Sequence, residues 1–382
     1  MMRGSDGVEV ELDAARLAMA DRTLHQGLQD QVYSAAVLLV AHCRRVVHVS
    51  SFGTTQPGGG YPVGADTLFD LASLTKPVVA LGLLALVEDG VLSLGDPLEA
   101  VLPEAAGTPV AAVTLRHLAT HTSGLPPWRP VYRAGLSATG TPEPDARRRM
   151  LDETLRIPLH DVPGTRYAYS DLGYLLLGEA VSRAAGMGLQ EYLRGRIFNA
   201  LGLEDLGYLP SAGQSERIAA TANSSIRPGR MLIGEVHDEN AWVFGGVAGH
   251  AGLFGTAKDL AVLAIALAGD GTAEGRRLLS LPALRLCRTN QLAPAVGGHS
   301  IGWFTPPNSM LPRGDLLSEA AFGHTGFTGT MIVIDPVEEL AVVLLTNRVV
   351  NPADNGGIQR IRRSVLNAIA SAIGCRERSS RG

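Results

Sequence analysis

The chain has 382 residues, of which 46% are hydrophobic and 18% are charged, a composition that supports a large core and excludes the disordered class. Its formal net charge is −4, so neither nucleic acid nor an anionic membrane is expected as a partner, because both select basic surfaces. Three well-separated cysteines, Cys43, Cys287 and Cys375, form neither a disulfide framework nor a Cys-x-x-Cys motif and fit a reducing compartment.

The N-terminal segment lacks the pattern of an export signal. Residues 1–7 (MMRGSDG) lead into acidic residues and not into an apolar segment. The nearest candidate for a membrane span, residues 260–268, has only the length of a core helix. We therefore expect a cytoplasmic protein with no membrane partner.

Strand patterns lie at both ends of the chain. After a helix over 12–28, strands are expected at 34–41 and 45–51, followed by a Gly/Pro-rich loop over 53–62. The C-terminal part returns to strands and closes with a helix. These C-terminal elements are expected at 320–323, 329–335, 340–346 and, for the helix, 359–373.

Helices dominate the middle of the chain up to residue 201, and residues 205–256 are loop-like before another helix at 257–267. The helices expected before that loop lie at 98–102, 114–120, 145–157, 172–185 and 189–201. Strands at both ends predict one sheet built from both termini. The predicted domains are therefore an α/β domain of residues 1–75 and 300–382, and a mostly helical domain of residues 76–299 with active-site loops.

The segment 69–77 (FDLASLTKP) places a serine and a lysine three residues apart at the start of a helix. Residues at this spacing are neighbours on a helix, so Ser73 and Lys76 should lie within reach of each other. A neighbouring base makes a serine hydroxyl nucleophilic, and lysine can be that base whereas arginine stays protonated. The chain has 31 arginines and only two lysines, Lys76 and Lys258. The use of lysine and not arginine at position 76 therefore indicates proton transfer. The alternative is that Lys76 forms an ion pair with a surface carboxylate.

Two further segments carry candidate chemistry. Tyr169 lies in 167–174 (YAYSDLGY) at the mouth of a helix, and a tyrosine near a lysine can act as phenolate or proton shuttle. The alternative is a packing residue. The segment 323–329 (GHTGFTG) heads an apolar hairpin, where glycines allow close backbone approach by a ligand. A backbone N–H from this edge and that of Ser73 would form an oxyanion hole, while His324 taken alone could be structural.

Together these segments resemble the motifs of the serine β-lactamase and penicillin-binding-protein superfamily, in particular the class C β-lactamase-like branch that includes family VIII carboxylesterases. Its Ser-x-x-Lys, Tyr-x-Asn and Lys-Thr-Gly elements are matched by 73–76, 169–171 and 324–326. The segments 113–126 and 249–261 are also typical of this branch. The resemblance covers about residues 30–370. It implies an α+β fold of the β-lactamase/transpeptidase type, with an antiparallel sheet flanked by helices, a mostly helical second domain and the site between them.

The resemblance also implies a covalent acyl-enzyme mechanism. Ser73 would attack a carbonyl, and Lys76 and Tyr169 would take and return protons. The N–H groups of Ser73 and Phe327 would hold the oxyanion. The substrate-binding residues implied in the same way are Asp171, His324, Thr325 and Gly326.

A metal site is the rival interpretation of the segment 234–240 (GEVHDEN) with His250. Its spacing fits neither a His-Glu-x-x-His nor a Cys-rich pattern, so we interpret the segment as a loop that borders the acyl pocket. We expect no cofactor and no metal.

Two departures from the family pattern bear on the substrate. Asp171 stands where the family has Asn, and an ionised carboxylate accepts hydrogen bonds but cannot donate one to a β-lactam amide. His324 replaces Lys, so a fixed positive charge becomes one that titrates near neutrality. We therefore expect a carboxylesterase acting on small esters, with weak β-lactamase activity at most.

Several alternatives stay open at this point. They are a β-lactamase, a D-alanyl-D-alanine carboxypeptidase or other muropeptide-processing enzyme, a non-hydrolysing penicillin-binding protein, and an inactive scaffold. The expected partner is a small-molecule ester or amide, and the oligomeric state is left undetermined.

Overall fold

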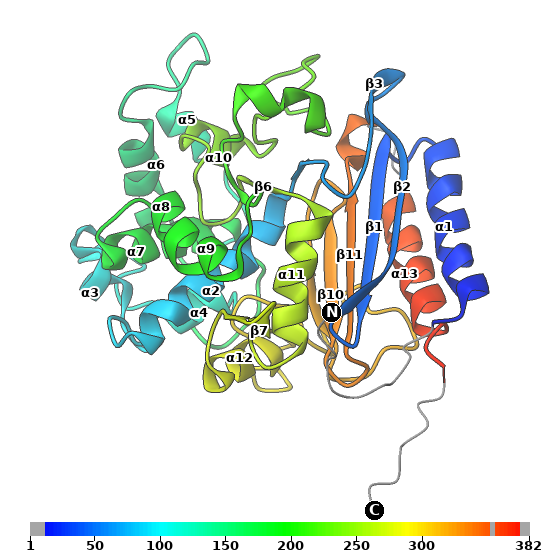
Figure 1. The fold of residues 1–382 in the computed structure, drawn as a ribbon. Coiled ribbons are helices and arrows are strands. Elements are labelled where there is room, and N and C mark those ends of the chain that lie inside the picture. Colours follow the sequence, from blue (N-terminus) through cyan, green and yellow to red (C-terminus); the bar gives the residue numbers. More distant parts are fainter. Residues whose placement is uncertain (1–11, 352–355, 375–382) are drawn as a thin grey trace, which may run out of the picture.

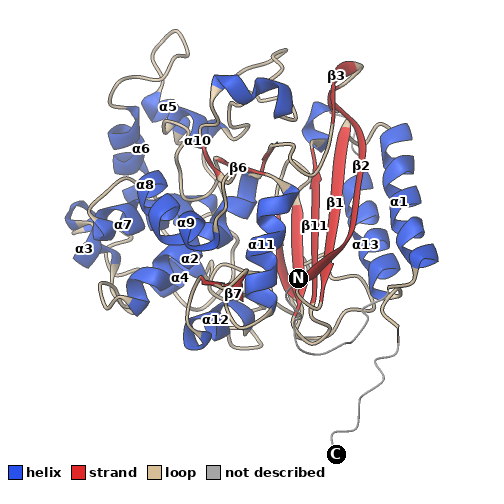
Figure 2. Ribbon diagram, in the orientation of Figure 1, coloured by secondary structure: helices blue, strands red, loops and turns tan. Residues whose placement is uncertain are grey.

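A six-stranded antiparallel sheet is built from both ends of the chain (Figures 1 and 2). The structure is a computed structural model that describes residues 12–351 and 356–374. The central pair joins β1 (Ala35–His42) to β11 (Leu340–Thr346), with Leu39 opposite Val343. The strand order is β3-β2-β1-β11-β10-β9. The remaining strands are β2 (Arg45–Gln56), β3 (Gly59–Pro62), β9 (Phe322–Thr325) and β10 (Met331–Asp335).

The sheet is covered on both faces, which explains why β1 reads as a continuous apolar run. Alternate β1 side chains enter two different cores, Val37 and Leu39 on one face and Leu38 on the other. Helices α1 (Ala14–Gln29) and α13 (Gly357–Ala370) pack together on the Leu38 face.

Helix α11 (Ala257–Ala268) covers the opposite face of the sheet, between it and the helical region (Figure 1). It contacts β1, β10 and β11. The predicted helical domain of 76–299 includes α11, although this helix packs on the sheet. Its packing, which periodicity cannot show, places it with the sheet.

The predicted loop over 53–62 is instead a hairpin. Strand β2 continues to Gln56, and β3 pairs back on it through a turn in which Gly58 has φ +70°. Glycine adopts such positive φ without steric cost, and its low β-propensity concealed the strand from sequence patterning. At the other edge, β9 lies two residues later than predicted, which carries it to Thr325.

The helical region is organised around α2 (Thr75–Glu88), which runs from the sheet edge into that region and is buried along most of its length. The segment 205–256 forms only short elements, as its loop-like composition predicts. These include β5 (Gly207–Tyr208), α10 (Glu239–Val243) and β6 (Leu253–Gly255), and β6 pairs with β4 (Phe69–Asp70). The other helices of eight or more residues in this region are α6 (Ala146–Leu155), α7 (Asp171–Ala185) and α12 (Leu281–Arg288).

Over residues 12–351 and 356–374, no helix combines the length and the apolar character needed to cross a membrane. Cys287 is a buried free thiol. Cys375 and the N-terminal seven residues, on which two of the sequence predictions depend, lie outside the described residues.

Candidate active site

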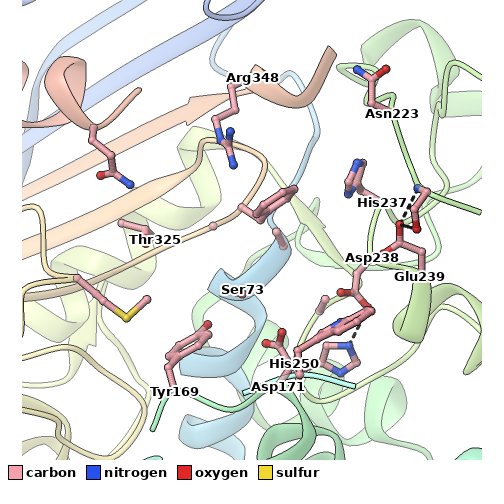
Figure 3. A pocket seen from close by; sticks show the side chains of 18 of the residues that line it. Ser73, Tyr169, Asp171, Asn223, His237, Asp238, Glu239, His250, Thr325 and Arg348 are labelled. Atoms are coloured by element: carbon pink, nitrogen blue, oxygen red, sulfur yellow. Dashed lines mark hydrogen bonds and ion pairs between the residues drawn. The ribbon is translucent and has the colours of Figure 1, made fainter. Parts of the chain in front are cut away.

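A pocket of about 490 Å³ lies where the sheet edge meets the helical region (Figure 3). One wall is made by the turn directly ahead of α2, the start of α7 and the end of β9, which contribute Ser73, Asp171 and Thr325. The other wall comes from the segment 223–251. Residues distant in the chain therefore meet in one cavity.

Ser73 and Lys76 are neighbours, as their spacing predicts. Ser73 lies in a single 3₁₀ turn, Ala72–Leu74, that runs directly into α2. Lys76 is fully buried in the first turn of α2, and its Nζ lies 2.9 Å from Ser73 Oγ. The hydroxyl is thus in hydrogen-bond reach of a group that can exchange its proton.

Lys76 is held by groups from two other parts of the chain. Its Nζ donates to the His250 carbonyl oxygen at 2.9 Å and lies 2.7 Å from Asp171 Oδ1. The Tyr169 ring centroid is 4.9 Å away. The acid that pairs with Lys76 is therefore a member of the same pocket and not a distant surface carboxylate.

Tyr169 is placed by the start of α7. Ser170 caps this helix by accepting from the Gly173 N–H, and its hydroxyl donates to the Pro126 carbonyl. Burial raises the pKa of Tyr169 well above its ordinary value and the charge of Asp171 adds to this, while interaction with Ser73 opposes it. The phenol is therefore neutral at neutral pH. That state favours a proton shuttle over a resting phenolate.

The third motif reaches the pocket through its backbone and Thr325. Thr325, Gly326 and Phe327 line the cavity. A Cβ at Gly326 would clash with the Leu71 carbonyl oxygen, and Thr330 Oγ1 donates to that same oxygen at 3.1 Å. Glycine is needed here because the strand edge and the Ser73 turn approach each other closely. This contact holds the segment that carries Phe327 against the turn that carries Ser73, and both residues line the same pocket.

His324 is not where the sequence analysis expects it. Its side chain is fully buried, stacks on Phe304 with ring centroids 4.2 Å apart, and is absent from the pocket lining. Successive strand residues face opposite ways, so Thr325 on the pocket side leaves His324 on the other. Burial, and then the charge of Lys76, lower the pKa of His324 well below its ordinary value. The predicted substrate contact and near-neutral titration are therefore both corrected.

Two more buried histidines lie behind Tyr169. His121 Nδ1 accepts from the Ser170 N–H at 2.9 Å, and its ring lies 4.4 Å from that of Tyr169. His299 packs edge-on against His121, and burial lowers the pKa of His299 to about 4. The sequence analysis missed both residues, although His121 belongs to the family-typical segment 113–126. They support Tyr169 as neutral rings.

The segment 234–240 borders the pocket, as interpreted from the sequence, and contributes His237, Asp238 and Glu239 to its lining. Asp238 Oδ1 accepts from His250 Nε2 at 2.8 Å. Burial acts to raise the pKa of Asp238, but the charge and hydrogen bond of His250 outweigh it and lower that pKa to about 2. Over the part of the chain that the structure describes, no group of three or more His, Cys, Asp or Glu side chains could hold a metal ion.

The sequence analysis also missed Arg348, which follows β11. Its guanidinium lies 4.6 Å from the Phe327 ring centroid and contributes to the pocket lining (Figure 3). Nothing in its local sequence sets it apart from the other arginines. It supplies a positive charge on the pocket wall, where the sequence analysis expected one from His324.

Comparison with known proteins agrees with this geometry. Residues 20–366 match the profile of the family described as Beta-lactamase. The chain belongs to the beta-lactamase family. Within it, the chain is 32% identical to a putative D-alanyl-D-alanine carboxypeptidase of Escherichia coli (strain K12) over 366 residues. That match covers 88% of this chain and 83% of the relative.

Solved structures share the beta-lactamase fold. EstCE1, a hydrolase with promiscuous acyltransferase activity, superposes with a TM-score of 0.74 at 20% identity, covering 93% of this chain and 99% of its own. A class C beta-lactamase from Rhodobacter sphaeroides gives 0.69 at 23% identity, covering 92% and 99%. The predicted fold and superfamily are therefore confirmed, and this member of the beta-lactamase family is a serine hydrolase.

Proposed function

We propose that this enzyme hydrolyses small carboxylic esters through an acyl intermediate on Ser73. The observation that carries the proposal is the row of three groups Ser73 Oγ, Lys76 Nζ and Asp171 Oδ1, with separations of 2.9 and 2.7 Å. A carboxylate in this position accepts hydrogen bonds only. It offers no amide donor to a β-lactam, whereas an ester needs less help because its alcohol leaves more readily than an amine.

These three groups can pass a proton from Ser73 to Lys76 and from Lys76 to Asp171. Lys76 can take the proton of Ser73 if it first passes one of its own to Asp171, which lies 2.7 Å away. Ser73 Oγ then bonds to the acyl carbon, and the returned proton leaves with the alcohol. A water molecule then attacks the acyl carbon with the same proton transfers. The bond to Ser73 Oγ breaks, Ser73 regains its proton and the acid is released. Neutral Tyr169 shuttles protons beside Lys76, and the N–H groups of Ser73 and Phe327 face the oxyanion.

The test is a panel of short-chain nitrophenyl esters with a chromogenic cephalosporin, assayed on the wild type and on Ser73→Ala. We expect ester cleavage that Ser73→Ala abolishes, with much slower cephalosporin turnover. Strong cephalosporin turnover without ester cleavage would overturn the choice of substrate.

A second candidate, a D-alanyl-D-alanine carboxypeptidase, is favoured by Arg348 on the pocket wall, since guanidinium groups pair well with carboxylates. The printed name of the Escherichia coli relative points the same way. The test is release of D-alanine from a peptide ending in D-alanyl-D-alanine. If this function is right, Arg348→Gln raises KM for the peptide at least tenfold and leaves KM for a neutral ester unchanged.

Two outcomes would favour the remaining alternatives. A stable penicillin adduct on Ser73, seen by mass spectrometry, would indicate a non-hydrolysing penicillin-binding protein. An absence of labelling by a fluorophosphonate probe would indicate an inactive scaffold. We also propose a cytoplasmic location, which cell fractionation tests. The proposed partner is a small-molecule ester or amide, with no nucleic-acid or membrane partner, which affinity purification tests.

A further inference from the structure

Asp70 is a buried carboxylate directly ahead of the Ser73 turn. It ends β4 and is 2% exposed. Its Oδ1 accepts from the backbone N–H of Ala72 at 2.9 Å, and its Oδ2 accepts from the backbone N–H of His237 at 2.7 Å. A single side chain thus joins the two walls of the pocket.

The first of these bonds holds a strained residue. Ala72 has φ +47°, a backbone conformation that residues other than glycine rarely adopt. Such a conformation persists only where the surroundings over-determine it. Because Ala72 immediately precedes Ser73, its conformation sets the orientation of the peptide that carries the Ser73 N–H. The bond to Asp70 therefore bears on the proposed oxyanion hole.

The bond from the His237 N–H to Asp70 is connected, through three further residues, to the hydroxyl of Ser73. His237 is followed by Asp238, which accepts from His250 Nε2 at 2.8 Å. The His250 carbonyl accepts from Lys76 Nζ at 2.9 Å, and the same Nζ lies 2.9 Å from Ser73 Oγ. The contacts form a closed ring that starts and ends at Ser73, and Figure 3 shows its labelled members around the cavity.

The backbone of Asp70 is tied to the third motif as well. Its carbonyl oxygen accepts from Thr328 Oγ1 at 2.7 Å. Thr328 follows Phe327, whose N–H is the second proposed oxyanion donor. Asp70 is thus bonded to segments that carry both proposed donors and to the segment that orients Lys76.

We propose that Asp70 is a positioning residue for acyl transfer, whose carboxylate aligns the Ser73 turn with the loop that holds Lys76. The inference rests on the proposed function, since it takes Ser73 as the nucleophile. Asp70 lies behind the turn and does not itself touch substrate. Its effect should appear in the chemical step and not in substrate binding.

The experiment compares Asp70→Asn with Asp335→Asn. An amide can accept from one of the two N–H groups but presents its own NH₂ to the other. We expect kcat for a nitrophenyl ester to fall at least tenfold with KM within threefold. The rate at which a fluorophosphonate probe labels Ser73 should fall by the same factor.

Asp335 provides a matched control. It is fully buried at the far end of β10, and its carboxylate accepts from the Ser318 backbone and hydroxyl and from the Val337 N–H. Asp335→Asn should lower the melting temperature and leave kcat and the labelling rate unchanged. An equal loss of kcat in both variants would show that Asp70 only stabilises the fold, and would overturn the proposal.

A second-site change tests the mechanism directly. Glycine adopts positive φ without steric cost, so Ala72→Gly added to Asp70→Asn should recover kcat at least threefold over Asp70→Asn alone. No recovery, or a kcat for Asp70→Asn within twofold of wild type, overturns the inference.

If Asp70→Asn does not fold, Thr328→Val removes the bond to the Asp70 carbonyl with a side chain of similar shape. It should lower kcat threefold to tenfold at constant KM, and an unchanged kcat would contradict the proposal. The labelling assay separates the two hypotheses. Absence of label on wild-type Ser73 overturns the proposed function as well, whereas a labelled wild type with an equally reactive Asp70→Asn overturns only this inference.

Discussion

The two walls of the pocket are built by different means. The wall that carries Ser73, Lys76 and Thr325 consists of a helix start and a strand end, whose backbone hydrogen bonds are local or belong to a sheet ladder. The facing wall, residues 223–251, has only short elements and depends on buried polar contacts such as those of Asp238 and Arg227. The first wall therefore carries the groups of the proposed chemistry, and the second depends on a few side chains for its shape.

The sharpest test of the first wall is Lys76→Arg. The charge stays, but a guanidinium cannot give up a proton as an amine can. We expect kcat/KM for a nitrophenyl ester to fall by about a thousandfold or more, the scale of losing a proton-transfer group. The control is Lys258→Arg, at the exposed second lysine on α11, which should retain full activity. Retained activity in Lys76→Arg would remove the lysine from proton transfer.

Asp171→Asn addresses the proton acceptor on the same wall. The amide takes no proton from Lys76, so ester kcat should fall by about a hundredfold, at the lower end of general acid–base effects. The same amide can donate to a substrate carbonyl. The ratio of cephalosporin to ester kcat/KM should therefore rise. A lower ratio in steady-state assays of both substrates would show that Asp171 does not set the preference for esters.

The second wall should fail in a different way. Arg227 is buried, its Nη2 donates to the carbonyls of Val236 and His237 at 2.8 and 2.9 Å, and its guanidinium lies 4.6 Å from the Trp242 ring. Arg227→Met should lower the free energy of unfolding by about 3 kcal/mol, because the carbonyl oxygens of Val236 and His237 lose their charged donor.

In ester kinetics, Arg227→Met should raise KM more than it lowers kcat, because the loop that lines the pocket loosens while the Ser73 turn stays in place. Arg230 is exposed and pairs with Glu235 at 2.7 Å. Arg230→Met is the control and should change stability by less than about 1 kcal/mol. A larger loss of stability in Arg230→Met than in Arg227→Met would show that the second wall does not depend on its buried polar contacts.

The smallest expected effect concerns His299, which packs against His121 behind Tyr169. In the folded protein the pKa of His299 is about 4 against an ordinary 6.5. Between these values the unfolded chain binds a proton that folded His299 does not, so the free energy of unfolding decreases as pH falls from 6.5 to 4. The slope is about 1.4 kcal/mol per pH unit for each such histidine.

Urea unfolding at pH 7.5 and 5.0 measures this loss, and His299→Gln should reduce the difference between the two. Exposed His25 serves as the control, and His25→Gln should leave the difference unchanged. A protein equally stable at both pH values would show that burial does not keep this cluster neutral.

Much of the first wall could be predicted from the sequence. The i, i+3 spacing of Ser73 and Lys76 on a helix start is a local geometric constraint. The apolar runs at 34–41 and 340–346 predict strands. The second wall could not be predicted beyond its loop character, because its shape depends on contacts such as His237 N–H to Asp70, which join segments far apart in the chain.

His324 shows why a motif match alone does not place a side chain. Its position in the third motif suggested a substrate contact, yet a strand residue faces whichever side its register with the neighbouring strand dictates. Here His324 pairs with Ile332 and Thr325 with Met331. A shift of one residue would exchange their faces.

The amino-acid sequence alone determined the serine–lysine pair, the sheet assembled from both termini and the superfamily. Each of these depends on the spacing of nearby residues or on the order of motifs along the chain. Only the tertiary structure decided that Asp171 pairs with Lys76, that His324 turns inward and that Asp70 joins the two walls. Those relations depend on strand register and on hydrogen bonds between distant segments, which only the folded chain brings within reach.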